Sequence, residues 1–408
     1  MSATAEQVSP ASTSPQSSAP ATAQPEAVST SKGPPHHLCI WQGLGLPNFI
    51  RLMTWKPELS RSCLDRLISS AIMSVVNSTL NTVDRAVWGG RVRRQAISQA
   101  PVFILGHWRS GTTMLHNLMT LNPKLTFLNL FQCLFPGHFL LTERFLAPAT
   151  EFLLPETRPM DEVAVSWASP QEDEVALAVD CLLSPYVMAA FQGRLDVYER
   201  FLDPADMSES ERKRWKHSLL TLIRRMAVRK NARVVMKSPS HTYRVPALLE
   251  LFPDARFVYI KRDPRAVYQS TMHLRKVMFA ENTLGSMRPD VWSEETLYLY
   301  EKCIRKYESA KHLIPQGHLY ELRFEDLEAA PFNTLQDLHQ SLGLEGWTEA
   351  EPLVRAECQK LAAYRKNSYR MPAETRELVE SRLKWVLELY GYPLTASEKP
   401  TDADAPRS

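Results

Sequence analysis

Two glycines with four residues between them enclose an arginine in a loop that ends an apolar run. The segment Phe103–Thr113 reads FILGHWRSGTT, with Gly106 and Gly111 at the ends of the loop. This G-x-x-x-x-G spacing is that of the Walker A loop, whose backbone N–H groups surround a phosphate at a helix N-terminus. Thr112 stands where the Walker A lysine would contact the β- and γ-phosphates of a nucleoside triphosphate. The sequence therefore predicts a phosphate cradle that carries a different cation, Arg109.

Two further cations end apolar runs that are rich in β-branched residues. Lys237 ends RVVMK, Arg262 ends RFVYIKR, and Ser270 follows Arg262 by about two helical turns. Open parallel sheets bind ligands beyond the carboxyl ends of their strands. A single Arg or Lys at such a position is usually a solvated surface charge. Three cations in order along one sheet instead indicate a site for an anion.

The chain between about 100 and 345 alternates short apolar runs with helical patterns, which is typical of parallel βαβ units. Strands are predicted at 102–105, 233–237, 256–262 and 318–324. Helices are predicted from the loop to about 121, from Asp263-Pro264, and over 331–344. Asp is a favoured N-cap residue and Pro a favoured first helical residue. A mostly helical insertion is expected at about 124–232.

These motifs resemble those of a known family. GHWRSGTTMLHNLM resembles the 5′-phosphosulfate-binding loop of sulfotransferases that use 3′-phosphoadenosine 5′-phosphosulfate (PAPS), and YIKRDPRAVYQS resembles their 3′-phosphate motif. LYELRFEDLEAAPFNTLQDLHQSLGL is similar to a later strand–helix segment of the family. The resemblance covers roughly 100–370 and is nearest to the bacterial-type and tyrosylprotein-like group. It implies a P-loop-type, three-layer α/β domain with a central parallel sheet.

The resemblance also implies roles for matching residues. Arg109 would stabilise the leaving phosphate, and Lys237 would contact the sulfuryl group. The residues expected to hold PAPS are Arg109, Ser110, Gly111, Thr112 and Thr113 at the 5′-phosphate, Arg262 and Ser270 at the 3′-phosphate, and Lys366 or Arg365 from YRKNSYR. The implied reaction transfers a sulfuryl group from PAPS to a hydroxyl, or as a second choice an amine, and releases the bisphosphate PAP. No metal is expected, since transfer needs chiefly alignment and charge stabilisation.

The general base is not evident from the motifs. A hydroxyl acceptor needs a base within hydrogen-bond reach, and tyrosylprotein-type members supply a glutamate shortly after the first helix. Here no acid occurs from Pro123 to Gln132. The acidic run in SPQEDEVAL is the first candidate, because crowded carboxylates raise one another's pKa, which favours a role as base. The same acids are also favoured in the first turn of a helix for structural reasons alone. The candidates, among which the choice is open, are Glu172, Asp173, Glu174, His241 and His107.

The composition indicates the cellular compartment and excludes one class of binding partner. The chain has 408 residues, 44% of them apolar, and a net charge of +3, too mild for a nucleic-acid-binding surface. Six cysteines occur without a C-x-x-C pair, so a disulfide framework is not expected. This cysteine pattern favours a reducing, cytoplasmic compartment. The acceptor cannot be identified: a small molecule, a lipid, a carbohydrate and a peptide all remain candidates. Aromatic residues of the insertion form either plain core or an apolar pocket: Phe131, Phe135, Phe139, Trp167 and Tyr186.

Four segments are expected along the chain. They are a disordered segment rich in Ser, Ala, Thr and Pro (1–36), a helical preface (37–98), the sulfotransferase P-loop domain (99–393) and a disordered tail (394–408). No signal peptide is expected, because the first segment lacks an apolar core. The region 38–88 either packs on the main domain or contacts a membrane surface, the second of which would make the protein membrane-associated.

Two other functions compete with sulfuryl transfer. A P-loop kinase or NTPase would need a lysine at the position of Thr112 and an acid for Mg²⁺. A non-catalytic PAPS- or PAP-binding protein on the same fold is favoured only by the missing glutamate after the first helix. Retention of both Arg109 and Lys237 argues against it, since binding alone needs no cation at the sulfuryl group.

Overall fold

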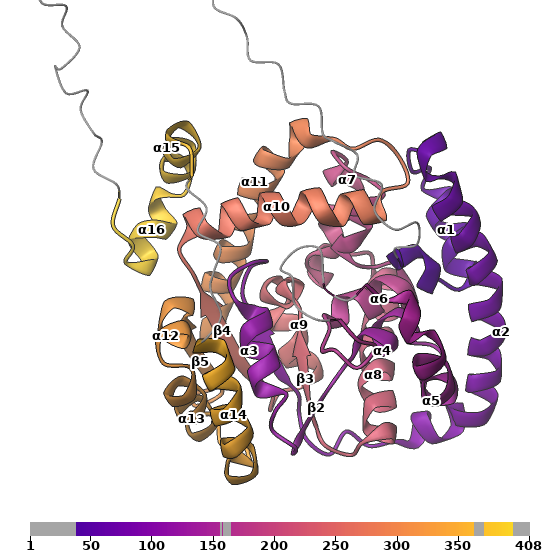
Figure 1. Cartoon of the computed structure of the whole chain (residues 1–408), viewed down its shortest axis with the longest axis horizontal. Coiled ribbons are helices and arrows are strands. Elements are labelled where there is room, and N and C mark those ends of the chain that lie inside the picture. The colour runs from indigo at the N-terminus through magenta and orange to yellow at the C-terminus, as the bar shows by residue number, and fades with distance from the viewer. Residues whose placement is uncertain (1–37, 156, 158–164, 363–370, 395–408) are drawn as a thin grey trace, which may run out of the picture. The chain divides into compact units, whose positions relative to one another are not determined.

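A parallel sheet of five strands lies at the centre of the structure, a computed structural model that describes residues 38–155, 157, 165–362 and 371–394 (Figure 1). The strand order is β2-β3-β1-β4-β5. In the register, Val102 of β1 lies opposite Val235 of β3 and Arg256 of β4. The strands are β1 (Val102–Leu105), β2 (Leu125–Phe127), β3 (Arg233–Lys237), β4 (Arg256–Lys261) and β5 (Leu319–Arg323).

The α/β class and four of these strands confirm the prediction from the sequence. The fifth, β2, lies inside the segment that was expected to be a helical insertion, and it pairs with β3 from Leu125 to Phe127. The predicted disordered segment 1–36, nearly all of the predicted tail 394–408, and Lys366 lie outside the described residues.

Side chains of the central strand alternate between two hydrophobic cores. Val102 and Ile104 belong to one core, and Phe103 and Leu105 belong to the other. Successive side chains of a strand point to opposite faces, so four consecutive buried residues require a cover of helices on both faces of the sheet.

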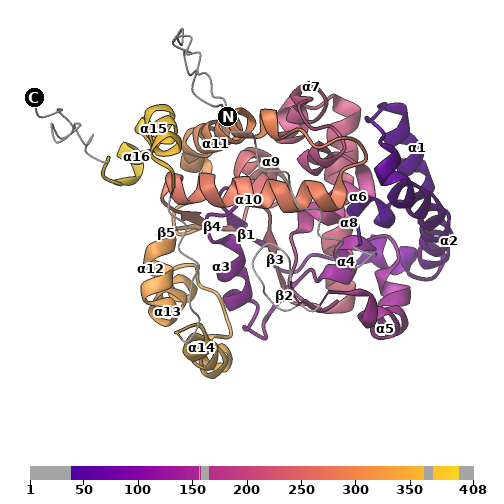
Figure 2. The same ribbon diagram turned by 45° about the horizontal axis from the view of Figure 1, so that its top comes forward.

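The two covers are formed by different parts of the chain (Figure 2). One face packs against α3 (Thr112–Met119), α12 (Phe324–Ala329), α13 (Pro331–Ser341) and α14 (Trp347–Ala362). The other packs against α8 (Glu209–Arg229), α9 (Val245–Leu251), α10 (Pro264–Asn282), α11 (Pro289–Ala310), α15 (Ala373–Arg382) and α16 (Lys384–Tyr390). As predicted, Asp263 caps α10, its carboxylate accepting from the backbone N–H of Arg265 at 2.9 Å.

The preface and the insertion add further helices. The preface contains α1 (Leu46–Thr54) and α2 (Leu64–Arg94). The insertion contains α4 (Leu130–Leu134), α5 (Phe139–Thr150), α6 (Asp173–Cys181) and α7 (Leu195–Tyr198). Short 3-10 helices are η1 (Ile40–Gly43), η2 (Arg61–Cys63), η3 (Glu151–Leu153), η4 (Pro185–Ala189), η5 (Glu199–Phe201), η6 (Pro204–Asp206), η7 (Pro239–Tyr243) and η8 (Lys311–Leu313). No helix in the described part of the chain combines the length and the apolar character needed to cross a bilayer.

A buried ion pair joins α2 to the helices beside it. Asp84 of α2 lies 2.8 Å from the guanidinium of Arg225 in α8, and both side chains are almost wholly buried. The same carboxylate accepts from the backbone N–H of Leu141 in α5 at 3.0 Å. One acidic side chain therefore ties three helices together.

Removal of Asp84 is expected to destabilise the protein strongly. In Asp84→Ala the Arg225 guanidinium keeps its charge in a buried position without its carboxylate, which typically costs about 3–5 kcal/mol. A urea titration followed by circular dichroism should show this loss. Asp65→Ala, at an exposed position of the same helix, should change the free energy of unfolding by less than about 1 kcal/mol. Equal effects of the two substitutions would contradict a structural role for the Asp84–Arg225 pair.

Candidate active site

The loop from β1 to α3 requires glycine at both ends. Gly106 has φ 141°, and a Cβ there would lie 2.7 Å from the carbonyl oxygen of Ile260 in β4. Gly111 has φ 104°, and a Cβ there would overlap the ring of Phe324. Only glycine satisfies both the backbone conformation and the close approach. The loop therefore packs directly on β4 and α12, and α3 begins immediately after it.

Arg109, Arg262 and Ser270, all expected from the sequence to hold the nucleotide, come together at this loop. The Nε of Arg109 donates to the hydroxyl of Ser270 at 2.7 Å, and Arg262 donates to the backbone oxygen of Arg109 at 3.1 Å. Arg109 has φ 68°, a left-handed conformation that is uncommon for a residue with a side chain and is typical of functional loops.

Arg262 also stacks over Phe324, with its guanidinium carbon 4.2 Å from the ring centroid. Burial lowers the pKa of Arg262 from its ordinary value, and the nearby Glu325 and Asp263 carboxylates oppose that shift. The ordinary pKa of arginine is so high that the side chain remains a cation. Arg109 of the glycine-bounded loop and Arg262, directly after β4, thus lie together.

Lys237, at the end of β3, lies beside Glu172, at the start of α6. Its Nζ is 2.9 Å from Glu172 Oε1 and 3.4 Å from the Thr113 hydroxyl. Tyr186 donates to the other oxygen of Glu172, and Trp108 donates to the Tyr186 hydroxyl at 3.2 Å. Lys237 is only 3% exposed and Glu172 is 18% exposed. A cation from the sheet and a carboxylate from the insertion therefore meet at one point.

The other two acids of the run do not join Glu172. Asp173 pairs with His241 at 2.6 Å, and both side chains are buried. Glu174 makes two hydrogen bonds to Arg244, at 2.6 and 2.9 Å, and this pair is fully buried. The expected crowding of the carboxylates is absent, because each one has a different basic partner. Neither Glu174 nor His241 borders the cavity described below, so the structure does not bring these two candidates to a reacting group.

The remaining residues of the loop have mainly local roles. Ser110 is buried and donates to the backbone oxygen of His107 at 2.8 Å. His107 packs edge-on against Tyr300. Burial, with a smaller contribution from Arg275, lowers the pKa of His107 to about 3. Its imidazole is therefore neutral at pH 7.

A cavity of about 1040 Å³ joins these groups to an apolar chamber. Its polar end is lined by Arg109, Thr112, Thr113, Lys237, Arg262 and Glu172. Its apolar wall includes Leu38, Ile40, Leu130, Leu134, Met188 and Met278. Of the insertion aromatics proposed for a pocket, Tyr186 lines this cavity, whereas Phe131, Phe139 and Trp167 are buried in the core.

Glu281 also borders the cavity, and its titration reports on the surroundings. Burial raises the pKa of Glu281 to about 7, opposed by the charge of Arg66. The shift follows from the burial of this carboxyl at the cavity wall. Sequence reasoning did not find Glu281, nor the wall residues Leu38 and Ile40 of the preface, because no local motif relates them to the loop.

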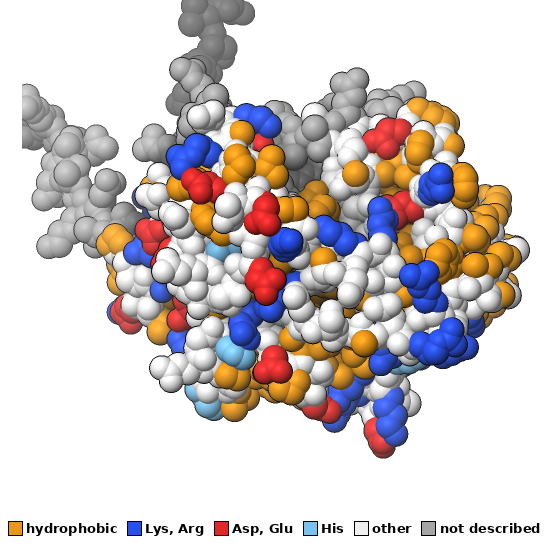
Figure 3. Space-filling model, turned by 90° about the horizontal axis from the view of Figure 1, so that it is seen from below, with side chains coloured by type: hydrophobic (Ala, Val, Ile, Leu, Met, Phe, Trp, Pro, Cys, Tyr) orange, Lys and Arg blue, Asp and Glu red, His pale blue; other side chains and the backbone are white. Residues whose placement is uncertain are grey.

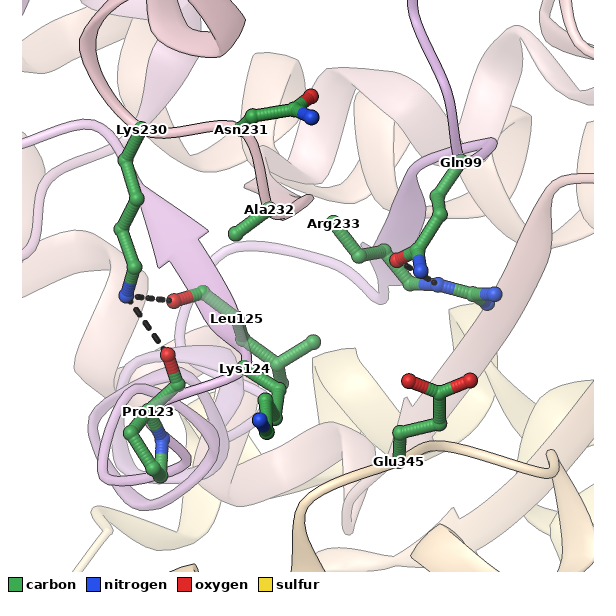
Figure 4. Close-up of a pocket in the computed structure, with 9 residues that line it drawn as sticks. All are labelled: Gln99, Pro123, Lys124, Leu125, Lys230, Asn231, Ala232, Arg233 and Glu345. Atoms are coloured by element: carbon green, nitrogen blue, oxygen red, sulfur yellow. Dashed lines mark hydrogen bonds between the residues drawn. The ribbon is translucent and has the colours of Figure 1, made fainter.

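A second, smaller hollow lies at the opposite edge of the sheet, where β2 and β3 begin (Figure 4). Its cations already have partners within the chain. Lys230 points to the carbonyl oxygens of Pro123 and Leu125, at 2.7 and 2.9 Å, and Arg233 donates to the side chain of Gln99 at 3.4 Å. Lys230 and Arg233 therefore already bond groups of the chain itself.

The chain is similar to known proteins in sequence and in fold. A family model described as the sulfotransferase family matches residues 101–349. Two relatives, both named omega-hydroxy-beta-dihydromenaquinone-9 sulfotransferase Stf3, come from Mycobacterium bovis and Mycobacterium tuberculosis. Each is 38% identical over 354 residues, which cover 86% of this chain and 91% of the relative.

Solved structures of two sulfotransferases share the fold. STF9 from Mycobacterium avium matches with a TM-score of 0.62 and 18% identity, over 88% of this chain and 93% of that one. STF1 from Mycobacterium tuberculosis matches with a TM-score of 0.54 and 17% identity, over 82% of this chain and 89% of that one.

The close packing at Gly111 generates a prediction about stability. Gly111→Ala should lose about 1–2 kcal/mol from the left-handed conformation, and a further penalty of about 1–3 kcal/mol from overlap with Phe324. Gly317 also has a positive φ, 77°, but a Cβ there would meet nothing within 4 Å. Gly317→Ala should therefore show only the conformational part. In chemical denaturation, Phe324→Ala should cost less in the Gly111→Ala background than in the wild type, and strict additivity of the two substitutions would refute the overlap.

Proposed function

The chain belongs to the sulfotransferase family, and from this premise we propose that it transfers a sulfuryl group from PAPS to a hydroxyl at the end of a long apolar molecule. The observation that carries the proposal is the Lys237–Glu172 pair. Lys237 contacts Thr113 at the start of α3, and Glu172 contacts Tyr186 in the cavity wall. The pair thus stands where the polar end of the cavity meets its apolar chamber.

The residues of the loop fit a nucleotide with two separate phosphate groups. The glycine-bounded loop leads directly into the N-terminus of α3, where unsatisfied backbone N–H groups favour an anion. Arg109 suits forked contact with a phosphate at the loop, and Arg262 with Ser270 suits the second phosphate. When bound, PAPS supplies a sulfuryl group joined to phosphate through an anhydride oxygen.

Two side chains then carry the transfer. Glu172 takes the proton from the acceptor hydroxyl as the oxygen of that hydroxyl forms a bond to sulfur. Lys237 stabilises the negative charge that grows on the anhydride oxygen as the bond from that oxygen to sulfur breaks. Tyr186 holds the Glu172 carboxylate in position through its hydroxyl.

Glu172 is favoured as the base over the other candidates by its surroundings. It borders the cavity, whereas Glu174 and His241 are buried and paired elsewhere. His107 borders the cavity too, but a pKa of about 3 makes it a poor proton acceptor.

The class of acceptor follows from the cavity wall and from the named relatives. A cavity of about 1040 Å³ is at the upper limit of the roughly 300–1,000 Å³ typical of small-ligand sites, so it has room for more than one molecule. Its wall beyond Glu172 is mainly aliphatic and thioether side chains. The relatives are named for a hydroxylated menaquinone, a lipid alcohol. We therefore infer an acceptor of this kind, with its terminal hydroxyl at Glu172 and its apolar chain along the wall.

Binding of PAP tests the donor site. PAP at a hundredfold excess over its dissociation constant should stabilise the protein by about 2.7 kcal/mol, visible as a rise in melting temperature. Arg262→Ala should weaken PAP binding about 10–100-fold, through loss of a charge-assisted contact. Arg194→Ala, at an exposed arginine paired with Asp196, is the control and should bind PAP normally. Stabilisation by ATP with Mg²⁺ and not by PAP would favour the kinase alternative.

Substitution of Glu172 tests the transfer step. Glu172→Gln keeps the shape and the hydrogen bond from Tyr186 but cannot take a proton, so kcat should fall about 10²–10⁴-fold with PAP affinity unchanged. The assay measures sulfate transferred from PAPS to a long-chain primary alcohol. Tyr186→Phe should lower kcat by a smaller factor than Glu172→Gln, because Glu172 is still present to take the proton. Equal losses of PAP affinity and turnover in Glu172→Gln, or no turnover in the wild type, would favour a protein that only binds the nucleotide.

A further inference from the structure

The longest helix of the preface has its polarity reversed. In α2 the buried positions are mostly polar, and they include Ser70, Ser74, Asn77 and Asp84. Large apolar residues lie on the outside, each between 45% and 61% exposed: Leu64, Ile68, Ile72, Val75, Val83 and Val87. A surface helix of a water-soluble domain normally has the opposite arrangement, with its apolar side toward the core.

The exposed apolar residues lie along one side of α2. Their spacing of mostly three or four residues places them on one side of a helix that spans about 45 Å at 1.5 Å per residue. Ile50 of the neighbouring α1 is also 54% exposed. Figure 3 shows hydrophobic side chains gathered along the right-hand edge, which α1 and α2 form in Figure 1. We name the outer side of α1 and α2 the apolar face.

Polar contacts fix α2 in this orientation. The Asn77 side chain donates to the backbone oxygens of Gln42 and Leu44, at 2.8 and 3.0 Å. Asp84 pairs with the buried Arg225. Rotation of the helix to bury its apolar side would break these contacts and expose groups that are now satisfied. The outward apolar face is therefore specified by the structure.

The charges around this face are mainly positive. Residues 46–94 contain eight Lys or Arg and three Asp or Glu, and one of the acids, Asp84, is buried and paired. Four of the arginines lie in the last third of α2: Arg85, Arg91, Arg93 and Arg94. An exposed apolar stripe with basic residues around it is typical of a helix that lies in the interface of an anionic membrane.

The apolar face begins next to the apolar end of the cavity. Arg66, in the first turn of α2, donates to the backbone oxygens of Ala280 and Thr283. Met278, Phe279 and Asn282 of the same segment line the cavity. Ile40 of η1, which packs on α2, lines it as well. An apolar molecule at this face is thus beside the chamber wall.

We propose that the apolar face of α1 and α2 docks on the surface of an anionic lipid bilayer, with α2 lying in the plane of the interface. The choice of a bilayer as the occupant rests on the proposed function, because an acceptor with a long apolar chain resides in the bilayer. The apolar face then brings the cavity to the membrane that holds the acceptor.

The test compares two triple variants of the full chain in sedimentation with vesicles of equal parts phosphatidylglycerol and phosphatidylcholine. Ile68→Gln/Ile72→Gln/Val75→Gln removes three residues of the face and keeps good helix formers. Its affinity for the vesicles should fall about tenfold or more, since each of these side chains loses its apolar contact. The control is Leu353→Gln/Leu378→Gln/Leu389→Gln, at positions 50%, 48% and 46% exposed on other helices. The control should bind vesicles like the wild type.

Several outcomes would overturn the proposal. Absence of vesicle binding by the wild type would do so, as would equal binding by the two variants. A wild-type dimer that the face variant abolishes, without any vesicle binding, would assign the face to a second copy of the chain.

The same experiment separates docking from catalysis. The face variant should keep its PAP-induced stabilisation and its transfer to a short soluble alcohol, and lose transfer to a long-chain alcohol held in vesicles. Vesicle binding that depends on the face, without any sulfuryl transfer, would support docking and reject the proposed function.

Discussion

Three consecutive acids at the start of α6 determine how the insertion is joined to the sheet. Glu172, Asp173 and Glu174 each meet a different basic residue. These partners occur in the same order along the chain, with Lys237 at the end of β3 and His241 and Arg244 after it. The two inner pairs are buried, and breaking a buried pair by removal of one partner is costly. These two buried pairs hold α6 against η7. Because Glu172 directly precedes Asp173, they also keep Glu172 beside Lys237. The geometry of the candidate catalytic pair is thus a consequence of two contacts that do not border the cavity.

The other constraint on the site is the closeness of the loop to the elements around it. Phe324 contacts the position of Gly111 and also stacks with Arg262. Arg262 in turn reaches the backbone of Arg109, whose side chain bonds Ser270 of α10. Loop, β4, α10 and α12 therefore form one connected set of contacts around the two arginines. Because the cations are already held in place, little free energy is needed to rearrange them when an anion binds.

Local patterns were enough to predict the parts of this structure that local forces determine. The apolar runs predicted four of the five strands and placed Lys237 and Arg262 at strand ends, and the glycine spacing predicted the loop with Arg109 inside it. Strand β2 was missed because three residues carry too little periodicity, and its strand character depends on pairing with β3. The separate pairing of Glu172, Asp173 and Glu174 could not be read from the sequence, since the partners lie more than sixty residues away. Periodicity also cannot tell which side of a helix faces inward, and α2 shows that the usual assumption of an apolar inner side fails there.

The reversed polarity of α2 and the apolar wall of the cavity address the same physical problem. If the acceptor is a lipid alcohol, its hydroxyl must reach a polar site while its chain stays out of water, because each exposed methylene group costs about 0.8 kcal/mol. A chain longer than the cavity must leave part of its length in another apolar environment. A bilayer against the apolar face of α1 and α2 supplies such an environment. Under the proposed function, the outward apolar side of α2 therefore serves the substrate, while its polar side holds the protein together.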